Sequence, residues 1–213
     1  MKMITIFSSI AMLLFTTPAQ GNDERAITYD EIMGQAINNC PHAREVNIKP
    51  AILWQLVKIE QEAGVPARLR GMILAAACKE SGYNPNAEGD HKFSKNKKTP
   101  MAIGILQMWR IYEKMYPGLD RTNPKEAAKA WMNHIVKKIP KVKRQCKYRK
   151  EEKIWVAAWV TGIRSKKVGG RCKERPTHLR LLKKWHKNIK KERTSDERGY
   201  MERVPTIKKG DGC

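Results

Sequence analysis

A single glutamate, Glu80, stands at the end of an unusually apolar stretch of the chain, residues 72–78, and Ser81 and Gly82 follow it. Apolar surroundings favour the neutral form of a carboxyl group, and the partial negative charge at the C-terminal end of a helix acts in the same direction. Ala76 and Ala77 share the helix face of Glu80 and leave space in front of it. A carboxylic acid held protonated beside an open space is what a general acid requires. The alternative is an ordinary solvated glutamate at a helix end.

A second apolar stretch with two unusual residues begins twenty-two residues after Glu80, at Ala102. It reads Ala-Ile-Gly-Ile-Leu-Gln-Met over residues 102–108, with Gly104 and Gln107 inside it. A buried amide such as Gln107 needs a hydrogen-bonding partner. Between the two stretches, residues 83–87 carry turn-forming residues that lead into a polar loop. The carboxyl of Glu80 is therefore expected at a rim between the core and a cleft.

The two stretches together resemble the soluble lytic transglycosylases and their goose-type lysozyme relatives. The similarity rests on Glu-Ser-Gly-Tyr-Asn-Pro-Asn-Ala over 80–87 and Ala-Ile-Gly-Ile-Leu-Gln over 102–107. In that family a Glu-Ser pair ends a helix and a Gly-Leu-Met-Gln-like segment opens the next one. The resemblance covers residues 66–112 closely and continues more loosely towards residue 190. Two motifs in register are a stronger signal than one.

A third family motif, an Ala-Tyr-Asn-like triplet on a later helix, falls on Ala158, Trp159 and Val160. Trp replaces the expected Tyr and Val replaces the expected Asn. The phenol that would hydrogen-bond the glutamate and the amide that would hold a sugar are therefore both missing. Trp159 would either stack on a sugar ring or serve as a core aromatic.

The resemblance implies a reaction that needs only one catalytic carboxyl group. Glu80 would protonate the glycosidic oxygen between N-acetylmuramic acid and N-acetylglucosamine, and would then act as the base while the muramic 6-hydroxyl closes a 1,6-anhydro ring. A hydrolytic lysozyme would instead hold a water molecule, with Asp90 as a candidate second carboxylate. Glu88 and Asp90 are otherwise read as solvated charges of the polar loop.

The neighbours of Glu80 in the two motifs are expected to bind or shape the substrate site. Ser81 would hydrogen-bond near the acid or the sugar, or only cap the helix. Gly104 would let a sugar approach the backbone, or only permit a tight helix start. Gln107 would donate its amide to the substrate, and Met108 would form the cleft wall or the core. No metal is expected, because no cysteine or histidine pair has ligand spacing, and no cofactor is expected.

The length and the first residues predict an exported single domain. Residues 1–21 have the positive start, the apolar stretch and the small-x-small site of a secretory signal, and no other run is long enough to span a bilayer. We expect residues 22–64 to form helices that pack on a lysozyme-like transglycosylase domain over 65–193. A polar tail over 194–213 would follow. The protein would be periplasmic or secreted.

The positive charge is concentrated in residues 137–193, which carry 22 Lys and Arg against 4 Asp and Glu. Such a surface attracts polyanions. For an exported protein these are the anionic cell wall and lipid headgroups, and the export signal counts against nucleic acid. A non-catalytic cationic binding protein on the same scaffold is therefore the competing hypothesis to a peptidoglycan-cleaving enzyme.

Five cysteines are available for disulfides in an exported chain. Cys40 with Cys78 would tie a leading helix to the helix of Glu80, and Cys146 with Cys172 would close the basic segment. The five are Cys40, Cys78, Cys146, Cys172 and Cys213, and their odd count leaves at least one free or paired between molecules. The sequence alone leaves this connectivity open.

The elements that must position these residues are almost all helices. The patterns predict an all-α, lysozyme-like fold with a polar loop or small hairpin over the cleft at residues 84–100. Helices are expected over 29–39, 50–63, 66–79, 103–116, 124–139, 151–159 and 176–191.

Overall fold

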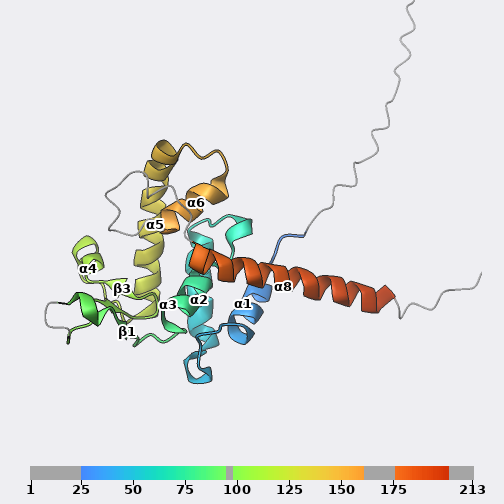
Figure 1. The fold of residues 1–213 in the computed structure, drawn as a ribbon, viewed down its shortest axis with the longest axis horizontal. Coiled ribbons are helices and arrows are strands. Elements are labelled where there is room, and N and C mark those ends of the chain that lie inside the picture. Colours follow the sequence, from blue (N-terminus) through green and yellow to red (C-terminus); the bar gives the residue numbers. More distant parts are fainter. Residues whose placement is uncertain (1–24, 95–97, 161–175, 202–213) are drawn as a thin grey trace, which may run out of the picture.

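The computed structural model describes residues 25–94, 98–160 and 176–201, and most of them are helical. The longer helices are α1 (Tyr29–Asn38), α2 (Pro50–Glu62), α3 (Met72–Ser81), α5 (Pro124–Cys146), α6 (Glu151–Val160) and α8 (Pro176–Met201). A small sheet and the short helix α4 (Ile111–Met115) lie to one side of these helices (Figure 1). The predicted mainly helical architecture is confirmed, whereas its relation to lysozymes stays a prediction.

Helix α3 lies at the centre of the fold. Residues 72–78 are all buried, and the helix packs against α1, α2 and α8. Helix α2 also contacts α5, and α5 contacts α6. A helix that is apolar on all sides needs neighbours all round, which explains why this stretch occupies the core. The N-terminal helices α1 and α2 thus share one hydrophobic core with the later helices.

Glu60 of α2 caps the start of α3. Its fully buried carboxylate accepts hydrogen bonds from the backbone N–H groups of Gly71 (2.6 Å) and Ile73 (2.8 Å). The N–H groups at the start of a helix have no partner within the helix, so they need one from elsewhere. Burial raises the pKa of Glu60 to about 7. Gly71 has φ of 88°, so the single helix predicted over 66–79 is wrong. The chain forms a 3₁₀ turn, Ala67–Leu69, and only then α3.

The predicted helix over 103–116 is also wrong. The chain instead forms three short antiparallel strands, β1 (Glu88–Gly89), β2 (Ala102–Ile103) and β3 (Met108–Trp109), in the order β1-β2-β3. A 3₁₀ turn, His91–Phe93, follows β1, and Ile103 pairs with Met108 across the β2–β3 turn. This turn contains two residues with positive φ, Gly104 at 82° and Gln107 at 45°, which no helix accommodates. The polar hairpin expected within 84–100 is thus part of a sheet that extends to Trp109.

Three later helices continue beyond their predicted ends. Helix α5 passes Pro140 and ends at Cys146. The proline removes the bond to the carbonyl of Val136, and because Val136 is exposed, solvent can take the place of that donor. Helix α6 ends one residue later than predicted, and α8 extends to Met201, so the first residues assigned to a polar tail belong to this helix.

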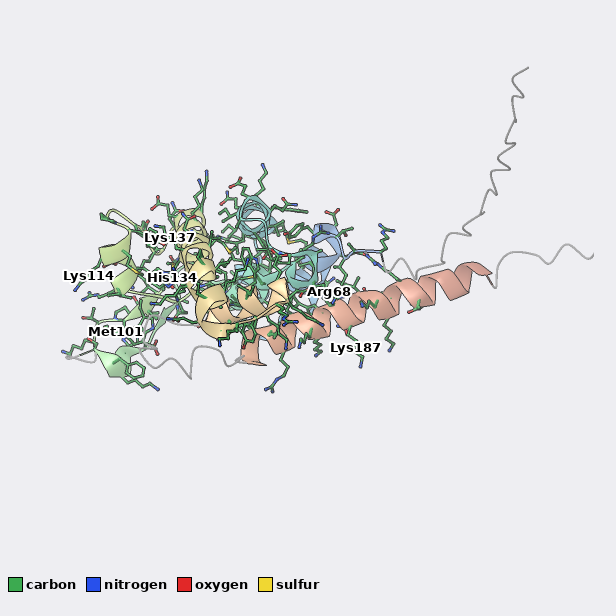
Figure 2. The ribbon with its side chains drawn as sticks, turned by 90° about the horizontal axis from the view of Figure 1, so that it is seen from above. Arg68, Met101, Lys114, His134, Lys137 and Lys187 are labelled. Carbon is green, nitrogen blue, oxygen red and sulfur yellow. A yellow bond between two sulfur atoms is a disulfide. The ribbon has the colours of Figure 1, made fainter. Side chains whose placement is uncertain are left out.

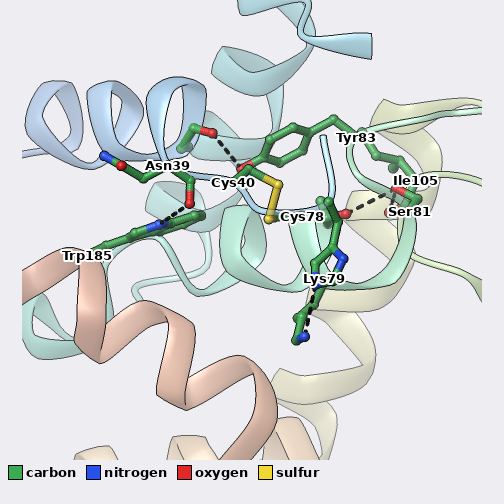
Figure 3. The surroundings of a disulfide bond; sticks show 11 residues. Asn39, Cys40, Cys78, Lys79, Ser81, Tyr83, Ile105 and Trp185 are labelled. Carbon is green, nitrogen blue, oxygen red and sulfur yellow. Dashed lines mark hydrogen bonds between the residues drawn. A yellow bond between two sulfur atoms is a disulfide. The ribbon is translucent and has the colours of Figure 1, made fainter. Parts of the chain in front are cut away.

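A disulfide joins Cys40, just after α1, to Cys78 in α3. It lies close to the end of α3, beside the indole of Trp185, whose Nε1 donates to the carbonyl of Asn39 (Figure 3). The second expected pair, Cys146 with Cys172, includes a residue outside the described parts of the chain, and the predicted signal over 1–21 lies wholly outside them. Within those parts, no helix combines the length and apolarity needed to cross a membrane.

Candidate active site

Glu80 lies where α3 reaches the surface. Cys78 is fully buried, while Lys79 and Glu80 are exposed, and 38% of the Glu80 side chain is accessible. The helix then ends at Gly82, which has φ of 58°. A side chain at Gly82 would collide with the backbone carbonyl of His42. The carboxyl therefore stands at the edge of the core, in a more open setting than the apolar run suggests, and the cleft expected in front of it stays a prediction.

The carboxyl of Glu80 is bound by a residue that the sequence analysis missed, His178. The imidazole Nε2 lies 2.7 Å from Oε1 of Glu80, and 25% of the His178 side chain is accessible. His178 lies in the first turn of α8, ninety-eight positions away in the chain. A contact this short, with a carboxylate or an imidazolium in it, is a strong charge-assisted hydrogen bond.

Two tryptophans support the His178 ring. Trp159 of α6 stacks on the imidazole, with ring centroids 5.7 Å apart and an angle of 30° between planes. Trp131 of α5 meets Trp159 edge to face at 6.4 Å. Only 9% of Trp159 is exposed, so in this structure its ring orients His178 and packs in the core. A role for Trp159 in stacking on a sugar stays a prediction.

Ser81 connects the two motifs in space. Its hydroxyl lies 3.1 Å from the carbonyl of Ala77 and 2.8 Å from the carbonyl of Ile105 (Figure 3). The first contact lies within α3, and the second holds the β2–β3 turn against the end of this helix. A hydroxyl group has a single proton to donate, so the two carbonyls share it. Ser81 thus joins the end of α3 to the β2–β3 turn beside Glu80.

Gln107 fastens the turn to the loop before β1. Its amide nitrogen donates to the carbonyls of Ala87 (2.9 Å) and Gly104 (3.1 Å). A side chain at Gly89 would collide with the amide oxygen of Gln107. The half-buried amide thus has hydrogen-bond partners within the protein. Donation to a substrate stays a prediction, and it would require one of these bonds to break.

Gly104 and Met108 face the protein interior. Both are buried, and a Cβ atom at Gly104 would collide with the backbone carbonyl of Arg121. The close backbone approach that this glycine permits is therefore made by the protein itself, and approach of a sugar stays a prediction. Met108 packs in the core, which is the second of the two roles considered for it.

Arg121 is a further residue that the sequence analysis missed. Its guanidinium is buried under the sheet and donates to the carbonyls of Met108 (2.6 Å) and Met101 (3.2 Å) and to the carboxylate of Glu113 (2.7 Å). A buried charge requires this degree of pairing. Arg121 therefore bonds the backbone of the sheet segment at Met101 and Met108.

The two loop carboxylates differ in exposure. Glu88 is 60% exposed and lies 3.9 Å from His91. Asp90 is half-buried, precedes the short 3₁₀ turn and has φ of 57°, and its role as a second carboxylate stays a prediction. Among the described residues, no group of three His, Cys, Asp or Glu side chains is arranged to hold a metal ion.

The contact with His178 leaves the carboxyl group of Glu80 open to solvent. Nε2 of His178 lies 2.7 Å from Oε1 of Glu80, and 38% of the Glu80 side chain is accessible. An oriented and accessible carboxyl group has the geometry that general acid or base chemistry requires.

A signal for His178 was present in the sequence. Leu182, Trp185 and Ile189 follow it by four, seven and eleven residues, so a helix places His178 on the same apolar face. That spacing predicts that the imidazole faces the core. It does not reveal that Glu80 is the partner.

Comparison with known proteins yields no match to this chain among protein-family models, curated proteins or solved structures.

Proposed function

We propose that the protein is a peptidoglycan lytic transglycosylase in which Glu80 is the single general acid and base. One observation carries the proposal. Two other segments of the family pattern lie next to the end of α3, where Ser81 bonds the carbonyl of Ile105 and Trp159 stacks on the histidine that binds Glu80. These segments are far apart in sequence, and their meeting at an accessible acid supports a common site.

The reaction would begin with transfer of a proton from Glu80 to the oxygen that links N-acetylmuramic acid to N-acetylglucosamine. The bond from this oxygen to the muramic C1 breaks, and the substrate's own acetamido group stabilises the positive charge at C1. The Glu80 carboxylate then takes the proton of the muramic 6-hydroxyl, whose oxygen bonds to C1 and closes the 1,6-anhydro ring. No water is consumed, and Glu80 ends the cycle protonated.

His178 would position the acid through this cycle. Its hydrogen bond fixes one carboxyl oxygen, and the stacked Trp159 limits rotation of the imidazole. Fixed orientation of a proton donor lowers the entropic cost of the reaction. This arrangement would replace the tyrosine hydroxyl that the family pattern has at position 159.

The test is the conservative variant Glu80→Gln, which keeps the shape of the side chain but replaces the acidic carboxyl group by an amide that is not acidic. Release of muropeptides from purified sacculi should fall by about 100-fold or more. The matched control is Glu88→Gln, which removes an exposed loop carboxylate and should leave the rate near that of the wild type. Unchanged release by Glu80→Gln protein would refute the assignment.

Mass analysis of the released muropeptides separates the two enzymatic reactions. Anhydromuramic ends identify a transglycosylase, whereas reducing ends identify a lysozyme that transfers water to C1. Binding to sacculi without release of fragments by the wild-type protein would favour the non-catalytic cationic binding protein instead.

A further inference from the structure

A large cavity lies next to the candidate site and shares the first turn of α8 with it. Its volume is about 980 Å³, which is at the upper end of the range for small-molecule sites. Residues 25–27, the 3₁₀ turn Ala67–Leu69, α6 and α8 form its walls. Leu179 lines the cavity, while His178, the preceding residue, holds Glu80.

The rim of the cavity is strongly cationic. One acidic residue, Glu152, lines it, and it lies 3.7 Å from Arg68, whose side chain is 83% exposed. Burial lowers the pKa of the lining residue His186, so its imidazole is neutral at neutral pH. The cationic lining residues are Arg25, Arg68, Lys150, Lys153, Lys183 and Lys190. Six positive charges against one negative charge among the described lining residues favour an anionic ligand.

The floor of the cavity is aliphatic. Among the described residues that line it, none is a phenylalanine, tyrosine or tryptophan. Sugar rings and nucleobases are usually bound against aromatic faces, so this floor is poorly suited to a glycan strand or a nucleic acid. Its apolar side chains are Ile27, Leu69, Val156, Leu179 and Leu182. An apolar floor below a cationic rim matches a molecule with an anionic head and a hydrocarbon chain.

We infer that this cavity binds the phosphate headgroup of an anionic phospholipid, with the first part of an acyl chain against the aliphatic floor. The charges of the rim would hold the phosphate, and burial of methylene groups would add a contribution that a free phosphate ion lacks. The inference does not rest on the function proposed for Glu80, because neither Glu80 nor His178 lines the cavity.

The test is binding of the full-length mature protein to vesicles that contain phosphatidylglycerol, with phosphatidylcholine vesicles as the neutral reference. The cavity variant is Lys183→Glu with Lys190→Glu, and the matched control is Lys184→Glu with Lys187→Glu. All four lysines are exposed on α8, but the second pair does not line the cavity. Figure 2 labels Arg68, which lines the cavity, and Lys187 on α8, which does not. Both double variants change the net charge by the same amount.

Affinity for the anionic vesicles should fall about tenfold or more in the cavity variant and by less than about threefold in the control. A second cavity pair on other segments, Arg68→Glu with Lys150→Glu, should behave like the first, which guards against a local folding defect in α8. The Glu80→Gln protein should bind as the wild type does, so loss of wall cleavage and loss of lipid binding are separate results.

Three outcomes would overturn the inference. Equal losses in cavity and control variants would mean that binding depends on diffuse charge. Displacement of the protein from vesicles by millimolar inorganic phosphate alone would assign the cavity to a free phosphate ion. An equal loss of binding to purified sacculi in the cavity variants would assign it to an anionic wall polymer.

Discussion

The titration of Glu60 should be visible in the stability of the whole protein. Its carboxyl is fully buried, and although Gly71 and Ile73 donate hydrogen bonds to it, burial dominates and raises its pKa from 4.5 to about 7. Between these pH values the folded protein holds a proton on Glu60 that the unfolded chain has already released. The free energy of unfolding should therefore fall by about 3 kcal/mol as the pH rises through this interval. Above the folded-state pKa, Glu60 should add no further change.

Chemical unfolding of the wild type and of Glu60→Gln protein between pH 4 and pH 8 isolates this contribution, because glutamine does not titrate. The unfolding free energy of the wild type minus that of the Glu60→Gln protein should fall as the pH rises from 4.5 to 7. The control is Glu62→Gln, an exposed glutamate on the same helix, whose difference curve should be nearly flat. A Glu60 difference curve that is flat, or that rises with pH, would refute the reasoning. The helix start would then stabilise the carboxylate more than burial opposes it.

Two further predictions concern the supports of the candidate site. Replacing Cys40 and Cys78 together by alanine opens a loop of 38 residues. The free energy of unfolding should fall by about 4 kcal/mol. An unchanged midpoint of urea unfolding would contradict this expectation. Gly104→Ala should cost about 2 kcal/mol or more, because its Cβ meets the carbonyl of Arg121 and its φ is 82°. Gly118→Ala, with φ of 80° and open space, should cost only about 1 kcal/mol. Equal losses in thermal unfolding would count against the steric argument.

Much of the helical framework could be predicted, because residues close to each helix end determine where the helix begins or ends. Pro50 begins α2, Asn123 caps α5 with hydrogen bonds to the next two N–H groups of the helix, and Gly82 ends the helix of Glu80. Each signal acts within a few residues of the boundary it sets. The expected disulfide between Cys40 and Cys78 is confirmed, although the sequence also allowed other pairings.

The hairpin around Gln107 could not be recognised from its pattern. Ile105 and Leu106 are both buried, so this segment lacks the alternation that marks a strand, and a short apolar run is equally compatible with a helix. The turn depends on the positive φ of Gly104 and Gln107 and on the buried Arg121 beneath it. These supports come from a segment more than ten residues away, and local propensity contains no information about them.

The sequence did not predict that His178 is the hydrogen-bond partner of Glu80. Helical spacing places His178 on an apolar face, but the contact with Glu80 depends on how α8 packs against α3. The missing tyrosine at position 159 was visible in the sequence. That a tryptophan there would orient a histidine from another helix could be learned only from the folded chain.

Two neighbouring residues of α8 belong to different sites, since His178 contacts Glu80 and Leu179 lines the cationic cavity. A ligand in the cavity that shifts the first turn of α8 would also shift the imidazole that holds Glu80. Thermodynamic linkage then requires reciprocity, so that a substrate bound at Glu80 would change the affinity of the cavity for its ligand by the same factor.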